Sequence, residues 1–206
     1  MQHDATVHVI DDDQAVRESL AFLLQSVRIP AVVHESASSF LTSLTTGQNG
    51  CIITDIRMPD ISGIDLLRRI KDLNVPMPVI VITGHGDVPL AVEAMKLGAF
   101  DFLEKPFDDE AMITTVRLAL NRAKQAEKAS ADRADLGKRI TSLSSRERDV
   151  LNGLIAGHSN KVIAANLSIS PRTVEIYRAN VMTKMQAESL SELVRMAITA
   201  GLAGSD

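Results

Sequence analysis

Short runs of β-branched residues alternate with amphipathic segments five times over the first 124 residues. In the first amphipathic segment Leu20 and Leu24 recur at helical spacing, whereas Arg17 and Gln25 fall on the opposite face. Strands that alternate with helices in this way predict an α/β fold with a five-stranded, doubly wound parallel sheet. The predicted strands cover residues 6–10, 30–34, 51–55, 78–82 and 100–103, and the predicted helices begin near Gln14, Ser38, Ile64, Pro89 and Asp109.

Residues 141–203 show a second pattern, in which helical segments follow one another without strands. Ser144 and Glu147 have the spacing of a capping box at the start of the first of these helices. A helix over 160–167 and a short turn come next, and Ser170 with Pro171 is a strong start for a third helix. The pattern predicts a small all-α, four-helix domain that contains a helix-turn-helix.

A charged, alanine-rich stretch joins the two patterns and contains no proline. Such a composition favours helix, and Asp135 and Arg139 are spaced as an i,i+4 ion pair. A solvated tether with fraying helicity is the alternative. We therefore expect an α/β domain over 1–124, a helical linker over 125–140 and the helix-turn-helix domain over 141–206.

Composition restricts where such a protein works. The 206 residues are 45% hydrophobic and include one cysteine, so a disulfide framework is excluded. No export signal and no apolar run of about 18 residues is present, so we expect a cytoplasmic protein without a membrane anchor. The first 124 residues carry 11 Lys and Arg against 17 Asp and Glu, and the remainder carries 11 against 9. That balance supports nucleic-acid binding by the second part only weakly.

Polar side chains follow the predicted strands at the points where the strands end. Right-handed crossovers bring these ends to one edge of the sheet, so the side chains are expected to converge. Two carboxylates about 4 Å apart repel by about 4 kcal/mol at an effective dielectric of about 20, so several of them require a cation. Oxygen ligands with open positions suit Mg²⁺. The expected metal ligands are Asp11, Asp12, Asp55 and the backbone carbonyl of Arg57, with Thr83 and Lys105 beside them.

The same edge can carry out phosphoryl chemistry. Asp55 can attack an in-line phosphoryl group whose charge is stabilised by Mg²⁺, Lys105 and the Thr83 hydroxyl. Taken singly, each residue has a plainer interpretation, as a helix cap, a turn residue or a surface charge. Asp13 is expected to cap the first helix rather than to bind metal. Because such residues follow several strands in turn, the full set of residues favours a metal-binding and phosphoryl-accepting site over these separate interpretations.

The third helix of the second domain has two distinct faces. Val174, Tyr177, Val181 and Met185 are expected to form core. The opposite face contains apolar and acidic groups, which suit contacts with base edges on the floor of a DNA major groove. Basic residues near this face are expected where the DNA phosphates would run. An ordinary amphipathic bundle is the alternative. The expected DNA contacts are Lys161, Arg172, Thr173, Glu175, Ile176, Arg178, Ala179 and Lys184.

The strand-end motifs resemble the receiver domain of two-component response regulators over about the first 120 residues. The resembling residues are the Asp11-Asp12 pair, Thr54 to Pro59, Thr83 to Asp87 and Lys105-Pro106-Phe107. The resemblance implies a flavodoxin-like fold, a phosphoryl group transferred to Asp55 from a sensor histidine kinase, and a cis Lys105–Pro106 bond. It also implies that Thr83 and Phe102 form a switch pair.

Residues 143–151 and 169–185 resemble the DNA-binding domain of LuxR-type regulators. With a receiver in front, the chain is similar to the NarL/FixJ class of response regulators. The resemblance implies a transcription activator of nitrogen-fixation genes that forms a homodimer when phosphorylated, binds promoter DNA and contacts RNA polymerase. In the closing helix, Leu190, Leu193, Val194, Ala197 and Ile198 suit a dimer contact and plain core equally well.

Two other functions use some of the same residues. Hydrolases that form an aspartyl phosphate place an acid/base Asp two residues after the nucleophile, but this chain has Arg57 there, so a turnover enzyme is not expected. Arg57 and His85 flank the site and are expected to tune the lifetime of the phosphorylated state. The remaining alternative is a phosphate sink or protein-binding adaptor in a phosphorelay.

Overall fold

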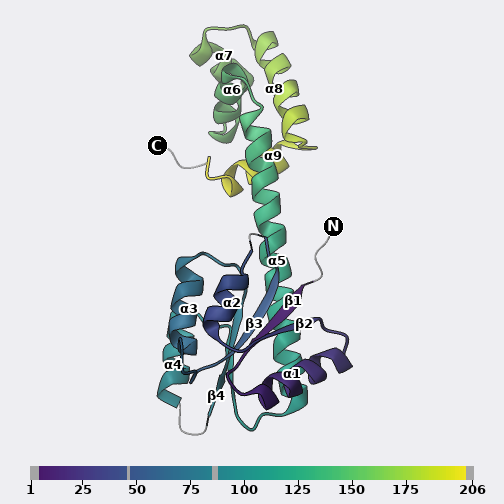
Figure 1. Ribbon diagram of the computed structural model, residues 1–206. Coiled ribbons are helices and arrows are strands. Elements are labelled where there is room, and N and C mark those ends of the chain that lie inside the picture. Colours follow the sequence, from purple (N-terminus) through teal and green to yellow (C-terminus); the bar gives the residue numbers. More distant parts are fainter. Residues whose placement is uncertain (1–4, 46, 85–87, 203–206) are drawn as a thin grey trace. The chain divides into compact units, whose positions relative to one another are not determined.

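The computed structural model describes residues 5–45, 47–84 and 88–202. The chain divides into two compact units, Met1–Glu127 and Lys128–Asp206 (Figure 1). Among the described residues, no helix has the length and apolar character needed to cross a membrane.

The first unit is built on a five-stranded parallel sheet with the strand order β2-β1-β3-β4-β5. Each predicted strand is present, and no strand end differs from the prediction by more than one residue. The order places β1 and β3 side by side in the centre, so their carboxyl ends lie next to each other. The strands are β1 (Thr6–Ile10), β2 (Ala31–His34), β3 (Gly50–Asp55), β4 (Val79–Thr83) and β5 (Asp101–Glu104).

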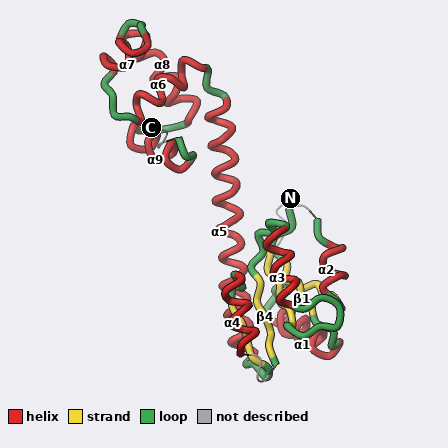
Figure 2. Tube along the Cα trace, turned by 90° about the vertical axis from the view of Figure 1, so that its left-hand side faces the viewer, coloured by secondary structure: helices red, strands yellow, loops and turns green. Residues whose placement is uncertain are grey.

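Helices cover both faces of this sheet, as the α/β prediction required (Figure 2). One face packs against α2, α3 and α4, and the other against α1 and the first part of α5. The four parallel strand pairs confirm the doubly wound parallel fold. The helices are α1 (Gln14–Ser26), α2 (Ala37–Ser43), α3 (Gly63–Asp72), α4 (Val88–Leu97) and α5 (Asp109–Thr141).

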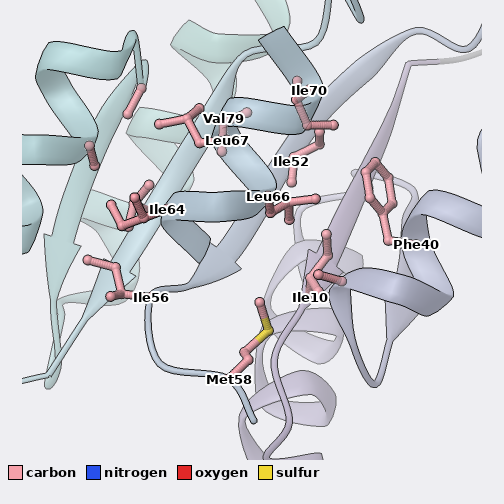
Figure 3. Close-up of a cluster of buried hydrophobic side chains, with 14 of the residues drawn as sticks. Ile10, Phe40, Ile52, Ile56, Met58, Ile64, Leu66, Leu67, Ile70 and Val79 are labelled. Atoms are coloured by element: carbon pink, nitrogen blue, oxygen red, sulfur yellow. The ribbon is translucent and has the colours of Figure 1, made fainter. Parts of the chain in front are cut away.

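Fully buried aliphatic side chains hold the sheet to its helices. On the face shown in Figure 3, Ile10, Ile52 and Val79 from three strands meet Leu66 and Ile70 of α3. On the other face, the residues one position along each strand meet α1 and α5. Strands buried on both faces explain why these runs are nearly continuously apolar in the sequence. The two layers fix the strand ends that carry the polar residues.

The second unit contains the remaining helices and the last part of α5. Leu136 and Ile140 of α5 join its core, which is centred on Val150 and Leu151. The helical prediction for 125–140 is confirmed, with the Asp135–Arg139 ion pair formed at 2.6 Å. The following helices are α6 (Ser145–Ile155), α7 (Asn160–Leu167), α8 (Pro171–Met185) and α9 (Leu190–Thr199).

Local capping signals account for where these helices begin. The capping box predicted at Ser144 and Glu147 is present. Ser159, Ser170 and Ser189 each accept a hydrogen bond from a backbone amide in the first turn of α7, α8 and α9. Between α7 and α8, Ser168 adopts a left-handed conformation that makes the turn of the predicted helix-turn-helix.

A buried histidine pair lies between the sheet and α2. The Nδ1 atom of His8 and the Nε2 atom of His34 are 3.0 Å apart, and both rings pack 5.3 Å from the ring of Phe40. Burial lowers the pKa of His8, and burial together with the charge of His8 lowers the pKa of His34 to about 4. Both side chains therefore favour the neutral form in the folded protein.

We expect this pair to make the first unit sensitive to acid. A histidine whose pKa is lowered by folding contributes stability above its unfolded pKa of about 6.5, and loses that contribution as the pH falls from there towards the folded pKa. For His34 alone, the free energy of unfolding should drop by about 2 kcal/mol between pH 7 and pH 5. Urea unfolding at both pH values measures the drop.

A His34→Gln variant can still bond to His8 but cannot ionise, so most of the drop should disappear. The matched variant His158→Gln removes an exposed histidine and should retain it. An unchanged drop in His34→Gln would show that other groups cause it.

Candidate functional site

Asp55 ends β3, the central strand whose six residues are all buried. The loop after it folds back tightly, since the amide of Gly63 donates to the carbonyl of Ile56 at 2.9 Å. A Cβ atom on Gly63 would lie 2.3 Å from the Asp55 carbonyl oxygen, so only glycine permits this approach. The Arg57 amide donates to Asp55 Oδ2 at 2.6 Å. Backbone contacts therefore orient the carboxylate, which is 8% exposed.

Lys105 joins two of the predicted carboxylates, although they are far apart along the chain. Its Nζ atom donates to Asp55 Oδ1 at 2.7 Å and to Asp11 Oδ2 at 2.9 Å. Lys105 follows β5, and the Lys105–Pro106 peptide bond is cis, as the resemblance implied. The structure thus brings Asp11, Asp55 and Lys105 together at the carboxyl edge of the sheet.

The ionisation of the pair reflects burial and mutual attraction. Burial raises the pKa of Asp55, while the ammonium of Lys105 and the Arg57 amide pull it down without reversing the rise. For Lys105, burial alone would lower the pKa, but the bonds to Asp55 and Asp11 outweigh it and raise the pKa. The lysine therefore stays charged at neutral pH and supplies the only countercharge that bonds both carboxylates in the described part of the site.

Asp12 is not among the carboxylates that Lys105 contacts. Its side chain is exposed, and among the described residues no group of three His, Cys, Asp or Glu side chains is arranged to hold a metal ion. Lys105 reduces the repulsion between Asp11 and Asp55 by pairing with one oxygen atom of each. Two carboxylates and one ammonium still leave one negative charge, and their oxygen atoms are of the kind that Mg²⁺ prefers.

An open groove lies beside the site. It is lined by Asp12, Arg57 and Met58 on one side and by residues of α3 and α4 on the other. Arg68 crosses it, bonded to Asp65 at 2.9 Å and to Glu93 at 2.7 Å. Arg68 could not be predicted from local patterns, because its partner Glu93 is 25 residues away.

Thr83 and Phe102 share one face of the sheet. Val81 pairs with Phe102 and Thr83 pairs with Glu104 in parallel register, so alternation along each strand puts Thr83 and Phe102 on the same side. Thr83 is 3% exposed, whereas Phe102 is 41% exposed on the edge strand. Asp13 caps α1 as predicted, by accepting from the Ala15 amide at 2.8 Å. His85 lies outside the described residues.

The two predicted faces of α8 are present. Val174, Val181 and Met185 are fully buried, and Tyr177 packs against them. On the opposite face, Arg172, Glu175 and Ala179 are exposed together with Ile176, which is 57% exposed. Ile176 is one of several large apolar side chains that are exposed among the described residues, and it lies on the face that the sequence analysis predicted to contact DNA.

Basic residues border that face, but they differ in how they are held. Lys161 and Arg172 are exposed. Arg178 is half-buried and donates to the Asn160 side chain at 3.4 Å, in a hollow that His158 and Ser159 also line. Thr173 bonds through its hydroxyl to Ser170 at 2.8 Å. Asn160 and His158 were not among the residues predicted from the sequence, and they lie beside Arg178 at the start of α7.

Lys184 is placed differently from what the sequence led us to expect. Its Nζ atom lies 2.7 Å from Glu147 Oε2 and 3.4 Å from the Ser142 carbonyl oxygen. Lys184, which was predicted to contact a DNA phosphate, is therefore paired with a carboxylate of the protein itself. In α9, Leu193 and Ala197 are buried, while Leu190 and Ile198 are 39% and 58% exposed.

Comparison with known proteins assigns both units. Residues 7–117 match the response regulator receiver domain, and residues 141–197 match the bacterial regulatory proteins of the luxR family. The transcriptional regulatory protein FixJ of Azorhizobium caulinodans is 59% identical over 206 residues, which cover 100% of this chain and 98% of that protein. FixJ of Rhizobium meliloti is 52% identical over 98% of this chain and 99% of that protein.

Solved structures show the same pair of domains. The response regulator StyR has a TM-score of 0.86 at 38% identity, over 95% of this chain and 99% of that chain. Full-length FixJ from B. japonicum has a TM-score of 0.61 at 53% identity, over 98% of this chain and 100% of that chain. Two domain matches, whole-length identity to named regulators and the strand-edge geometry agree with one another. The chain belongs to the response regulators in which a receiver domain precedes a LuxR-type DNA-binding domain.

Proposed function

We propose that Asp55 accepts a phosphoryl group from a sensor histidine kinase and that this modification controls DNA binding by the second unit. The observation that carries the proposal is the bridge from Lys105 to both Asp55 and Asp11 at 2.7 and 2.9 Å. An aliphatic residue would pack there at lower cost than a lysine between two buried carboxylates. Packing therefore does not explain why a lysine stands at this position.

The residues around Asp55 have distinct roles in this proposal. Asp55 Oδ1 or Oδ2 attacks the phosphorus, and the kinase histidine leaves. Lys105 and the Thr83 hydroxyl then bond to the phosphoryl oxygens, whose charge replaces that of the carboxylate. A Mg²⁺ ion held by Asp11, Asp12, Asp55 and the Arg57 carbonyl would supply the further positive charge that the site lacks. Receiver domains in general bind Mg²⁺ at this acidic site.

The change at Asp55 is passed on through Thr83 and Phe102. Thr83 moves to bond the new phosphoryl oxygen, and Phe102, now half-exposed on β5, turns into the space that Thr83 leaves. A shift from about 1:99 to about 99:1 between two states requires roughly 5.5 kcal/mol of differential binding, which a few charge-assisted hydrogen bonds supply. Arg57, and His85 beyond the described residues, tune how long the phosphoryl group stays.

The output is DNA binding by α8. Arg172, Thr173 and Arg178 bond to phosphates together with Lys161 of α7, while Glu175, Ile176 and Ala179 contact base edges in the major groove. Phosphorylation reshapes α4 and β5 and allows two chains to pair through that surface. Two recognition helices then reach half-sites about 34 Å apart.

The similar proteins suggest the target genes, the cellular location and a further partner. Since proteins named FixJ are similar over the whole chain, we propose that this regulator activates nitrogen-fixation genes from promoter DNA in the cytoplasm, with RNA polymerase as a further partner. It loses its own phosphoryl group slowly and does not turn over a substrate. We keep 1–124, 125–140 and 141–206 as the receiver, linker and DNA-binding segments.

A gel-shift series tests the function. Promoter fragments selected from genomic DNA are mixed with the full-length protein before and after treatment with acetyl phosphate and Mg²⁺. We expect the treated protein to bind at least about tenfold more tightly, in line with usual coupling energies. Binding to no fragment in either state would instead favour a phosphate sink or a protein-binding adaptor.

A further inference from the structure

A buried carboxylate at the start of α6 is not explained by the contacts of α6 alone. Glu147 is 4% exposed, and its Oε2 atom accepts from the Ser144 amide at 2.7 Å, which completes the capping box. A capping box consists only of the two reciprocal hydrogen bonds between the N-cap and N3 residues, so it does not by itself require burial. Glu147 is buried because a second helix lies over it.

That second helix is α8, and Lys184 supplies the contact. The ammonium of Lys184 lies 2.7 Å from the same Oε2 atom and 3.4 Å from the Ser142 carbonyl oxygen. The bond to Lys184, followed by that of the Ser144 amide, lowers the pKa of Glu147. A buried carboxylate with one ammonium as its charged partner is costly to leave unpaired. The cost of leaving Glu147 unpaired therefore stabilises Lys184 in this ion pair.

The carboxyl end of α8 is held at one more point. The Arg139 guanidinium donates to the Met185 carbonyl oxygen at 3.0 Å, and Met185 itself is fully buried. The amino end of α8, by contrast, starts at the exposed Ser170 cap and leads directly into the exposed face. One end of the helix is anchored, and the other end presents Arg172, Glu175 and Ile176.

We propose that Glu147 is a positioning residue for DNA binding, which acts by clamping Lys184 and thereby sets the direction in which α8 enters the major groove. Lys184 neutralises Glu147 and not a DNA phosphate. This inference rests on the proposed use of α8 as the recognition helix. It changes the role of one residue of the predicted set and adds one residue that touches no DNA.

Salt dependence separates a clamp from a phosphate contact. Each phosphate neutralised by a lysine contributes about 0.9 to the slope of log affinity against log salt. A lysine that neutralises Glu147 contributes nothing to that slope, whatever it does to the affinity. The matched control is Lys161→Met, which makes the same change at an exposed lysine of α7.

The experiment compares four full-length proteins treated with acetyl phosphate: wild type, Lys161→Met, Lys184→Met and the double variant Glu147→Gln/Lys184→Met. The probe is a duplex that the wild-type protein selects from fragmented genomic DNA, and thermal unfolding is recorded in the same buffer. The double variant leaves no unpaired charge, and its glutamine side chain can still accept from the Ser144 amide. It therefore keeps the comparison valid if Lys184→Met folds poorly.

We expect Lys161→Met to lower the slope by about 0.9. Lys184→Met and the double variant should keep the wild-type slope but bind the duplex at least about tenfold more weakly at temperatures where both are fully folded. The double variant should recover the unfolding temperature without recovering the affinity, which stability alone would not produce.

Two results would overturn the inference. A slope lowered by about 0.9 in the double variant would make Lys184 a phosphate contact. Wild-type affinity in the folded double variant would show that the clamp does not direct α8. If the wild-type protein binds no duplex, or if Lys161→Met leaves the slope unchanged, the proposed DNA-binding surface itself fails, and this outcome is distinct from the other two.

Discussion

Replacement of Asp55 by asparagine should abolish phosphorylation and leave the fold intact. An amide is not a nucleophile towards phosphorus under these conditions, and Asp55 is the carboxylate that Lys105 and the Arg57 amide both hold at the end of β3. We expect labelling from acetyl phosphate with Mg²⁺ to fall to background, and the phosphorylation-dependent gel shift to disappear with it. Intact mass measurement before and after treatment gives the stoichiometry.

The same variant should be at least as stable as the wild type. Because burial raises the pKa of Asp55, its ionised form opposes folding at neutral pH. An amide removes this penalty, so the free energy of unfolding should stay constant or rise by about 0.5 to 2 kcal/mol at pH 7. As the pH falls towards the unfolded pKa of about 3.9, wild-type Asp55 is protonated and the difference should shrink.

Asp60→Asn is the matched control for this experiment. Asp60 lies in the same loop but is exposed, and its Oδ2 atom accepts from the Ser38 amide at 3.3 Å. It should be labelled as the wild type is. Retained labelling at position 55 in Asp55→Asn, or loss of labelling in Asp60→Asn, would contradict the assignment of the phosphoacceptor.

A glutamate in place of Ala179 should remove DNA binding while leaving phosphorylation unchanged. Ala179 is a small, exposed residue on the α8 face that we assign to the major groove. A carboxylate there meets the negative potential of the duplex, and misplaced like charges cost several kcal/mol. The affinity for a selected duplex should therefore fall at least about 100-fold. Fluorescence anisotropy at fixed salt measures this fall.

Stability should not account for that loss. Ala179 is exposed and is not among the core residues in the described part of the second unit, and glutamate is a good helix former, so the change should cost about 0.5 kcal/mol or less. Ala134→Glu makes the same substitution at an exposed position of α5 and should bind DNA as the wild type does. Wild-type affinity in Ala179→Glu would move the DNA contact away from this face of α8.

The two domains differ in how far their sites could be predicted. In the receiver, Asp11, Asp55 and Lys105 were expected at one edge because parallel strands with right-handed crossovers leave few arrangements. Their contacts at 2.7 and 2.9 Å confirm that they converge. In the second domain, helical periodicity correctly separated the buried side of α8 from its exposed side. Periodicity did not show which exposed lysine was engaged within the protein.

The sequence by itself determined where helices and strands begin and end, which faces are buried and which polar residues follow strands. These features depend on neighbours within one or two turns, such as the capping box of Ser144 and Glu147. Only the tertiary structure decided the partners of Lys184, Arg68 and His34, which are 37, 25 and 26 residues away. Contacts between residues so far apart along the chain depend on how whole helices and strands pack, and local sequence periodicity does not predict them. The same packing put Lys105 within hydrogen-bonding distance of both Asp11 and Asp55, which lie 94 and 50 residues away along the chain.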